Sequence, residues 1–131
     1  MRHLLIDTHI FLWSQFEPAK LPAGMVQLLE DPAVSWHLSQ VSVWEIQVKY
    51  DLKKLTLPAP PLAFMDRLIE DSGFHFQEIQ NKAIYMLGKL PQIHRDPFDR
   101  LLIATALVNG WEIATVDSVI SEYPVQITLG K

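Results

Sequence analysis

The chain of 131 residues is 49% hydrophobic and 20% charged, has a formal net charge of −4, and contains no cysteine. This balance is typical of one folded domain over residues 1–131 rather than of a disordered chain, and it excludes disulfides and thiolate metal sites. No run approaches the ~20 apolar residues of a membrane helix, and the apolar run before Asp7 is too short for a signal peptide, so we expect a soluble cytoplasmic protein with no membrane partner.

Apolar runs, prolines and glycines divide the chain into short strands and amphipathic helices. In chain order we expect strand Leu4–Ile6, helix Ala23–Asp31, strand Val34–Leu38, helix Val41–Leu52, helix Leu62–Asp71, strand Phe74–Ile79, helix Asn81–Lys89, helix Asp96–Asn109, strand Trp111–Val116 and strand Val125–Leu129. Gly73 and Gly110 are typical of helix ends, and the residues from Asp7 to His9 are typical of a turn. Such an order indicates an α/β fold with a parallel sheet, whose functional groups gather at the carboxyl edge.

Two acids stand at that edge, one after each of two strands. Asp7 follows Leu4–Ile6, and Asp117 follows the strand that begins at Trp111. Each acid has a structural interpretation: Asp7 as the cap of a following helix and Asp117 as a cap or an Asx-turn. The same residue type at two strand ends favours a shared function.

Two further acids lie in helices. Glu45 follows Ser42 by three residues, which matches a capping box; if the helix begins earlier, near Ser39, the carboxylate of Glu45 reaches back over the sheet edge instead. Asp96 precedes a proline and is typical of a helix cap. Asp99 then falls in the first turn, where the helix dipole also favours an acid.

Carboxylates that converge on one edge repel one another and raise one another's pKa. A divalent cation among them removes this cost, and an all-carboxylate set selects a hard cation such as Mg²⁺. The histidines are not spaced as a zinc site requires. The sequence therefore favours a magnesium site at the carboxyl edge.

Four segments, taken in order, resemble the acidic motifs of the PIN-domain family, and in particular its VapC-like toxins: Leu5–Trp13, Ser39–Ile46 with Lys49, Leu90–Ala104 and Thr115–Asp117. The resemblance implies a three-layer fold in which a central, mainly parallel five-stranded sheet in the order 3-2-1-4-5 is flanked by helices. It implies a metal-dependent endoribonuclease that hydrolyses RNA with Mg²⁺, or with Mn²⁺ as a substitute. It also implies a cognate antitoxin protein as partner and is compatible with a homodimer.

The resemblance assigns the catalytic and metal-binding roles to four acids: Asp7, Glu45, Asp99 and Asp117. Asp7 and Asp99 are expected to be the main ligands. Supporting roles are expected for Thr8, Thr115 and Asp96. The alternative is a catalytically silent PIN-like module that binds RNA or a protein, although the presence of all four acids favours the nuclease.

The acidic net charge argues against a general nucleic-acid binder, so local cations must contact an RNA substrate. We expect this of Arg100, Lys49 and Arg95, against the structural alternative of a solvated helix face or an ion pair. Where the family usually has Gly-Lys-Leu after its second motif, this chain has Lys53, Lys54 and Leu55. Among the four tryptophans, Trp44 and Trp111 are expected in the core, and Trp13 is compatible with either the core or RNA stacking.

Overall fold

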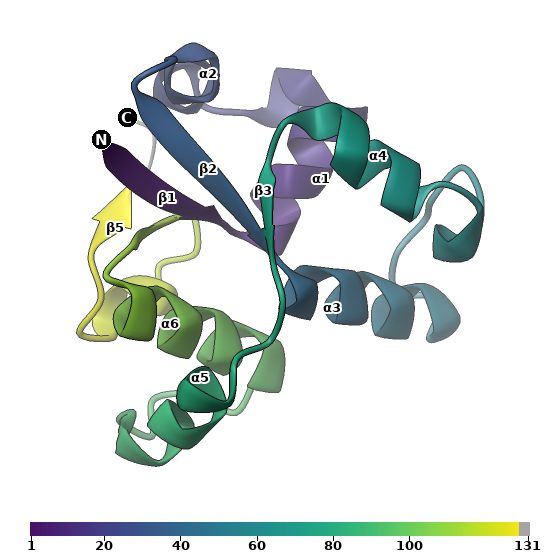
Figure 1. The fold of residues 1–131 in the computed structure, drawn as a ribbon. Helices are drawn as coiled ribbons and strands as arrows, with labels where there is room; N and C mark the ends of the chain where they lie inside the picture. The colour runs from purple at the N-terminus through teal and green to yellow at the C-terminus, as the bar shows by residue number, and fades with distance from the viewer. Residues whose placement is uncertain (129–131) are drawn as a thin grey trace.

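Five parallel strands form the centre of the structure, a computed structural model that describes residues 1–128. The strands are β1 Arg2–Ile6, β2 Val34–Ser39, β3 His75–Gln77, β4 Glu112–Ala114 and β5 Ile127–Thr128. They pair in the order β3-β2-β1-β4-β5, which confirms the expected sheet (Figure 1). β5 is shorter than the predicted Val125–Leu129, whose last residue lies outside the described residues.

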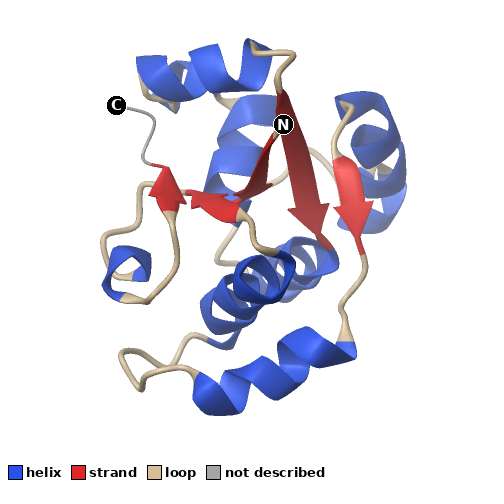
Figure 2. Ribbon diagram, turned by 60° about the vertical axis from the view of Figure 1, so that its left-hand side comes forward, coloured by secondary structure: helices blue, strands red, loops and turns tan. Residues whose placement is uncertain are grey.

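Helices cover both faces of the sheet. They are α1 Thr8–Phe16, α2 Ala23–Glu30, α3 Gln40–Asp51, α4 Met65–Ser72, α5 Asn81–Met86 and α6 Pro97–Asn109, joined by 3₁₀ turns at Pro18–Lys20, Pro61–Ala63, Leu87–Lys89 and Ile120–Glu122. Figure 2 shows helices on either side of the strands. None of the helices described is long and apolar enough to cross a membrane.

The two faces of the sheet bury separate hydrophobic clusters. Leu4 and Ile6 of β1 pack with α1 and α2, whereas Leu5 packs with α5 and α6. Because β1 is buried on both faces, its sequence is an unbroken apolar run rather than an alternating one. This burial fixes β1 in the centre, between β2 and β4.

The turn expected from Asp7 to His9 is wrong, because the chain enters helix α1 directly after Asp7. Thr8, Ile10, Phe11 and Leu12 are all buried, so apolar residues occupy consecutive positions of α1 and leave no clear amphipathic period. Tertiary packing thus overrides the weak local pattern.

Helix α3 begins earlier than predicted. Ser39 is its N-cap, and the Ser39 hydroxyl accepts a hydrogen bond from the backbone N–H of Val41 at 3.0 Å. The capping box between Ser42 and Glu45 is therefore wrong, and the earlier start considered from the sequence is confirmed. Glu45 lies well inside the helix and is free to point toward the sheet edge.

Helix α3 ends in a left-handed turn at Lys53, which has a φ of 60° and is the one non-glycine residue with a positive φ among residues 1–128. The N–H of Lys53 bonds to the Tyr50 carbonyl at 3.0 Å and that of Lys54 to the Lys49 carbonyl at 2.9 Å. This is the Schellman pattern that usually carries glycine. The change from Gly to Lys in this loop thus leaves the turn in place and adds backbone strain.

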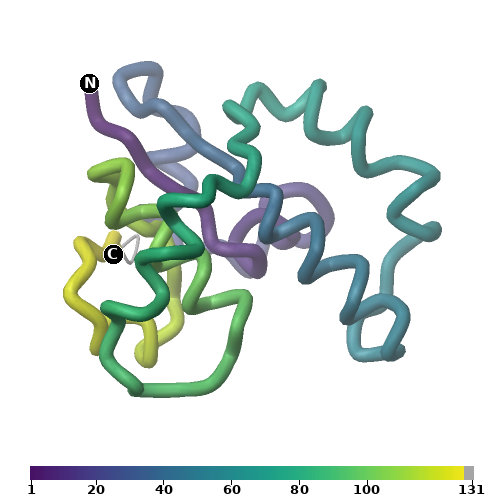
Figure 3. The backbone as a smooth tube through the Cα atoms, turned by 60° about the horizontal axis from the view of Figure 1, so that its bottom comes forward, coloured from purple at the N-terminus to yellow at the C-terminus, as the bar shows by residue number. Residues whose placement is uncertain are grey.

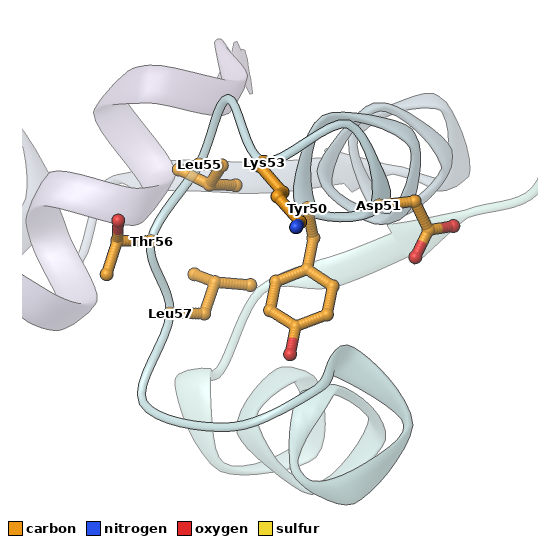
Figure 4. Close-up of a pocket in the computed structure, with 6 residues that line it drawn as sticks. All are labelled: Tyr50, Asp51, Lys53, Leu55, Thr56 and Leu57. Carbon is orange, nitrogen blue, oxygen red and sulfur yellow. The ribbon is translucent and has the colours of Figure 1, made fainter.

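The same turn borders a pocket of about 430 Å³ that is lined by Tyr50, Asp51, Lys53, Leu55, Thr56 and Leu57 (Figure 4). None of the acids assigned to the site lines it. The pocket belongs to the far end of α3, away from the carboxyl edge of the sheet.

We predict that Lys53→Gly raises the free energy of unfolding by about 0.5–1 kcal/mol, because glycine adopts the left-handed conformation without steric cost. Urea unfolding measures the change. Lys54→Gly is the matched control, since it adds the same backbone freedom at a neighbouring exposed site with no positive φ, and it is expected to lower stability. An equal fall in the free energy of unfolding in both variants would contradict backbone strain at Lys53.

Candidate functional site

The ends of β1 and β4 bring two of the predicted residues together. The N–H of Asp7 bonds to the Ala114 carbonyl at 3.0 Å, which extends the pairing of the two strands. The Thr115 hydroxyl then donates to Asp7 Oδ2 at 2.6 Å and accepts from the backbone N–H of Asp117 at 3.0 Å. Thr115 thus joins the two strand ends through one buried hydroxyl.

The carboxylates of Asp7 and Asp117 differ in what they do. Asp7 stands at the N-cap position of α1 but makes no cap hydrogen bond, so the helix-cap interpretation of its side chain is wrong. It is only 4% exposed and turns to Thr115 instead. Asp117 is half-buried, and its Oδ1 accepts from the Val119 N–H at 2.8 Å, as the Asx-turn interpretation expects.

Glu45 projects from α3 into the same region and is 2% exposed. Its Oε2 accepts a hydrogen bond from the ammonium of Lys49. Its Oε1 is buried without a hydrogen-bond partner among the described residues. A buried oxygen without a partner is costly unless a donor or a cation completes the site.

A second hydroxyl contact fixes α3 against α1. The hydroxyls of Thr8 and Ser42 lie 2.8 Å apart and are both buried. Because Thr8 follows Asp7 and Ser42 lies one helical turn before Glu45, this bond sets the relative positions of the two acids. The supporting role expected of Thr8 stays a prediction, and this contact is the geometry behind it.

The N-terminus of α6 supplies the remaining acids. Asp96 caps the helix as predicted, since its Oδ1 accepts from the N–H groups of Phe98 at 2.9 Å and Asp99 at 3.1 Å. One carboxylate oxygen each of Glu45, Asp96 and Asp99 lies within 4.8 Å of the other two. Asp96 therefore belongs to the acid cluster as well as to the cap.

Burial and crowding raise the pKa of two of these acids. Burial is the largest cause for Asp99, and the nearby charges of Asp96, Asp7 and Glu45 add to it, so that the pKa of Asp99 rises to about 6 despite a hydrogen bond from His94. Burial likewise raises the pKa of Asp7, with further repulsion from Glu45 and Asp117, although the Thr115 hydrogen bond opposes this. The four predicted acids therefore form one electrostatic group.

The ammonium of Lys49 is held by this group. Desolvation lowers the pKa of Lys49, but the hydrogen bond and charge of Glu45, with the charges of Asp96 and Asp99, outweigh it and leave the pKa raised. Lys49 therefore stays charged and partly neutralises the cluster. A contact of Lys49 with substrate stays a prediction.

Three residues hold Asp99 in place: Arg100, which the sequence offered as a substrate contact, and His94 and Tyr123, to which it gave no role. His94 Nδ1 lies 2.6 Å from the Tyr123 hydroxyl, and His94 Nε2 lies 3.2 Å from Asp99 Oδ2. The Tyr123 oxygen accepts hydrogen bonds from the backbone N–H of His94 at 3.2 Å and from the guanidinium of Arg100 at 3.3 Å. Its own hydrogen is therefore directed to Nδ1, which leaves Nε2 to donate to Asp99. We name His94, Tyr123 and Arg100 the Asp99 clasp.

The other predicted cations differ in their surroundings. Arg100 also donates to the carbonyl oxygens of Pro91 at 2.8 Å and Leu87 at 3.2 Å, so it ties α6 to the connection that follows α5, a wide loop in Figure 3. Arg95 is exposed and forms no ion pair with the residues described. Of the two, Arg95 is the better placed to meet a phosphate, and both contacts stay predictions.

The arrangement suits a hard divalent cation. Three carboxylate oxygens lie within reach of a common point, the buried Oε1 of Glu45 needs a partner, and the acids repel one another. Cations such as Mg²⁺ and Mn²⁺ prefer oxygen ligands. The donor set therefore fits such an ion. Asp7 and Asp117 are not among the three converging residues, but the charge of Asp7 acts on Asp99 and that of Asp117 acts on Asp7.

Comparison with known proteins supplies independent findings. A family model described as the PIN domain matches residues 4–126. Ribonuclease VapC22 of Mycobacterium tuberculosis is 27% identical over 123 residues, which cover 89% of this chain and 88% of that protein.

Solved structures show a similar fold. VapBC2 from Rickettsia felis, bound to a DNA fragment from its promoter, matches with a TM-score of 0.71 and 14% identity over 96% of this chain and 97% of that chain. A toxin–antitoxin complex from Klebsiella pneumoniae matches with a TM-score of 0.62 and 17% identity over 98% of each chain.

We predict that Asp99→Asn stabilises the protein at pH 7.5 and not at pH 3.5. The folded-state pKa of Asp99 is raised to about 6 from 3.8. The stability that the protonated acid contributes to the folded state is therefore fully present below pH 3.8 and is lost as the pH rises through about 6. Removing the charge should raise the free energy of unfolding at pH 7.5 by about 1–3 kcal/mol without added metal.

Thermal or urea unfolding at the two pH values measures this difference. Asp71→Asn is the matched control, because Asp71 is exposed and its change should stay within about 0.5 kcal/mol at both values. A loss of stability in Asp99→Asn at pH 7.5 would mean that the Asp99 clasp, rather than repulsion, dominates.

Proposed function

The chain belongs to the PIN-domain family, and from this premise we propose that it is a metal-dependent endoribonuclease and the toxin of a toxin–antitoxin pair. The relative named Ribonuclease VapC22, which aligns over most of both chains, supports this. The observation that carries the proposal is the convergence of Glu45, Asp96 and Asp99, of which Glu45 also has a buried oxygen without a hydrogen-bond partner among the described residues.

In this proposal Asp7, Glu45 and Asp99 hold the cation, and Asp117 contributes negative charge from the neighbouring strand end. Mg²⁺ is the expected ion and Mn²⁺ its substitute. Such an ion supplies positive charge against the developing charge on the phosphate and makes a nearby water more acidic. Asp96 shares the cluster and keeps its role as the cap of α6.

The chain's own residues orient the reacting groups. Thr115 fixes Asp7, the Asp99 clasp fixes Asp99, and Lys49 fixes Glu45. One carboxylate of the cluster accepts a proton from water as the water oxygen bonds to phosphorus. The bond from phosphorus to the 3′ oxygen breaks, and this oxygen takes a proton from solvent water, so the products carry a 5′-phosphate and a 3′-hydroxyl. A 2′,3′-cyclic phosphate would contradict this route.

The proposed partners are RNA and a cognate antitoxin. Arg95 is the proposed phosphate contact, which makes binding weaken as salt rises. The toxin–antitoxin complexes among the structural neighbours support an antitoxin partner. Leu62 is 97% exposed beside α4, and the apolar segments around Leu21–Leu29 and Leu62–Ile69 are proposed to receive an antitoxin helix. A homodimer is a further proposal.

We predict that the purified protein cleaves a mixed RNA pool with Mg²⁺ or Mn²⁺ and not with EDTA. Asp7→Asn should lower the rate by about 100-fold or more, because it removes a charge that holds the cation. Electrophoresis of end-labelled RNA measures the rate and identifies the product ends.

Asp66→Asn is the control for the loss of one carboxylate, since Asp66 is exposed on α4 outside the cluster. It should cleave like the unchanged protein. Cleavage that persists in EDTA and in Asp7→Asn would overturn the proposal. A folded protein that binds Mn²⁺ and cleaves no RNA would favour a catalytically silent binding module.

A further inference from the structure

An exposed tryptophan stands next to the acid cluster. Trp44 was expected in the core, and this expectation is wrong, because 46% of its surface is exposed. Trp111, by contrast, is half-buried against the hydrophobic cluster under α6 and stacks on His37. Trp13 packs against the hydrophobic cluster on the other face of the sheet. Trp44 therefore leaves about half of a large apolar ring in water, on the helix that carries Glu45.

The position of Trp44 is set by the same helices that carry the acids. Trp44 precedes Glu45 in α3, and its ring meets that of Phe98, which precedes Asp99 in α6. The ring centroids lie 4.7 Å apart at 76°, an edge-to-face contact. Phe98 also packs on the core under α6 and so anchors the pair. We name Trp44 and Phe98 the aromatic rim.

Among the described residues, few free positive charges lie near the acid cluster, so an RNA substrate needs contacts of another kind. The chain has a net charge of −4, Lys49 is held by Glu45, and Arg100 is used by carbonyl oxygens and Tyr123. Few cations remain near the cluster to hold an RNA backbone. Stacking on an aromatic ring does not depend on charge and accepts any base, and tryptophan is well suited to it.

We propose that the aromatic rim stacks a nucleobase of single-stranded RNA and so positions the phosphate beside it at the acid cluster. This inference rests on the proposed ribonuclease function and names how the same site holds its substrate. Trp44 supplies the free ring surface, and Phe98 fixes the angle of that ring. A base in a regular duplex is already stacked on both sides, so the rim selects unpaired RNA.

The test compares intact RNA with RNA that lacks a base. Proteins carry Asp7→Asn so that the RNA stays uncleaved, and binding of a labelled single-stranded 12-mer of mixed sequence is measured by fluorescence anisotropy in Mg²⁺. Trp44→Leu should weaken binding about 5- to 100-fold, which corresponds to the loss of one stacked base. Trp44→Tyr keeps an aromatic ring and should stay within about threefold.

The abasic 12-mer decides whether the effect is stacking. The protein with Trp44→Leu and the protein with Trp44 unchanged should bind the RNA without bases equally well. Tyr85→Leu is the control for the loss of an exposed aromatic ring, because Tyr85 on α5 is 73% exposed and should leave binding of both RNAs unchanged. Melting temperatures identify any variant that fails to fold.

An equal loss on both RNAs, or no loss on either, overturns the inference. So does a Trp44→Leu protein that binds RNA normally but no longer binds its antitoxin, since the rim would then be a protein contact. Failure of the proposed function is separate: it would show as the absence of RNA cleavage when Asp7 is intact. Cleavage by that protein together with unchanged binding by Trp44→Leu would overturn the stacking alone.

Discussion

Repulsion among buried carboxylates is the constraint on which the site depends. Oxygens of Glu45, Asp96 and Asp99 converge within 4.8 Å, and Asp7 adds a fourth charge that is almost fully buried. In a chain without a cation this arrangement raises the pKa of Asp99 and costs folding free energy. Residues at binding sites commonly sacrifice stability in this way. The same charges that repel one another attract a divalent cation, so the arrangement that lowers stability without the cation favours binding of the cation.

Hydrogen bonds from outside the cluster keep the acids from moving apart. The Thr115 hydroxyl joins Asp7 to the end of β4, and the Asp99 clasp extends from α6 to the segment near the C-terminus. These contacts use Arg100 and Lys49 inside the protein. The groups that we propose to contact a substrate are the cation, Arg95 and the aromatic rim. Phe98 of the rim also packs on the core under α6, so this side chain would serve both folding and the proposed substrate contact.

The sequence predicted the features that depend on local pattern. Apolar runs located the strands, and the sequence placed Asp7 and Asp117 at neighbouring strand ends, because parallel strands end at a shared edge. It missed contacts between residues distant in the chain, such as the hydrogen bond between His94 and Tyr123. It also missed α1, whose buried face is too wide to show a period. The exposure of Trp44 depends on how α3 meets α6, which no local pattern encodes.

We propose that the carboxyl edge of the sheet holds a divalent cation. Anomalous diffraction from crystals grown with Mn²⁺ at pH 7.5 tests this most directly, because the peak locates the metal without assumptions about activity. We expect a peak within about 2.0–2.4 Å of carboxylate oxygens of Asp7, Glu45 or Asp99. A well-ordered site that holds no Mn²⁺, with Lys49 still bound to Glu45 and the metal elsewhere on the protein, would contradict a cation at this edge.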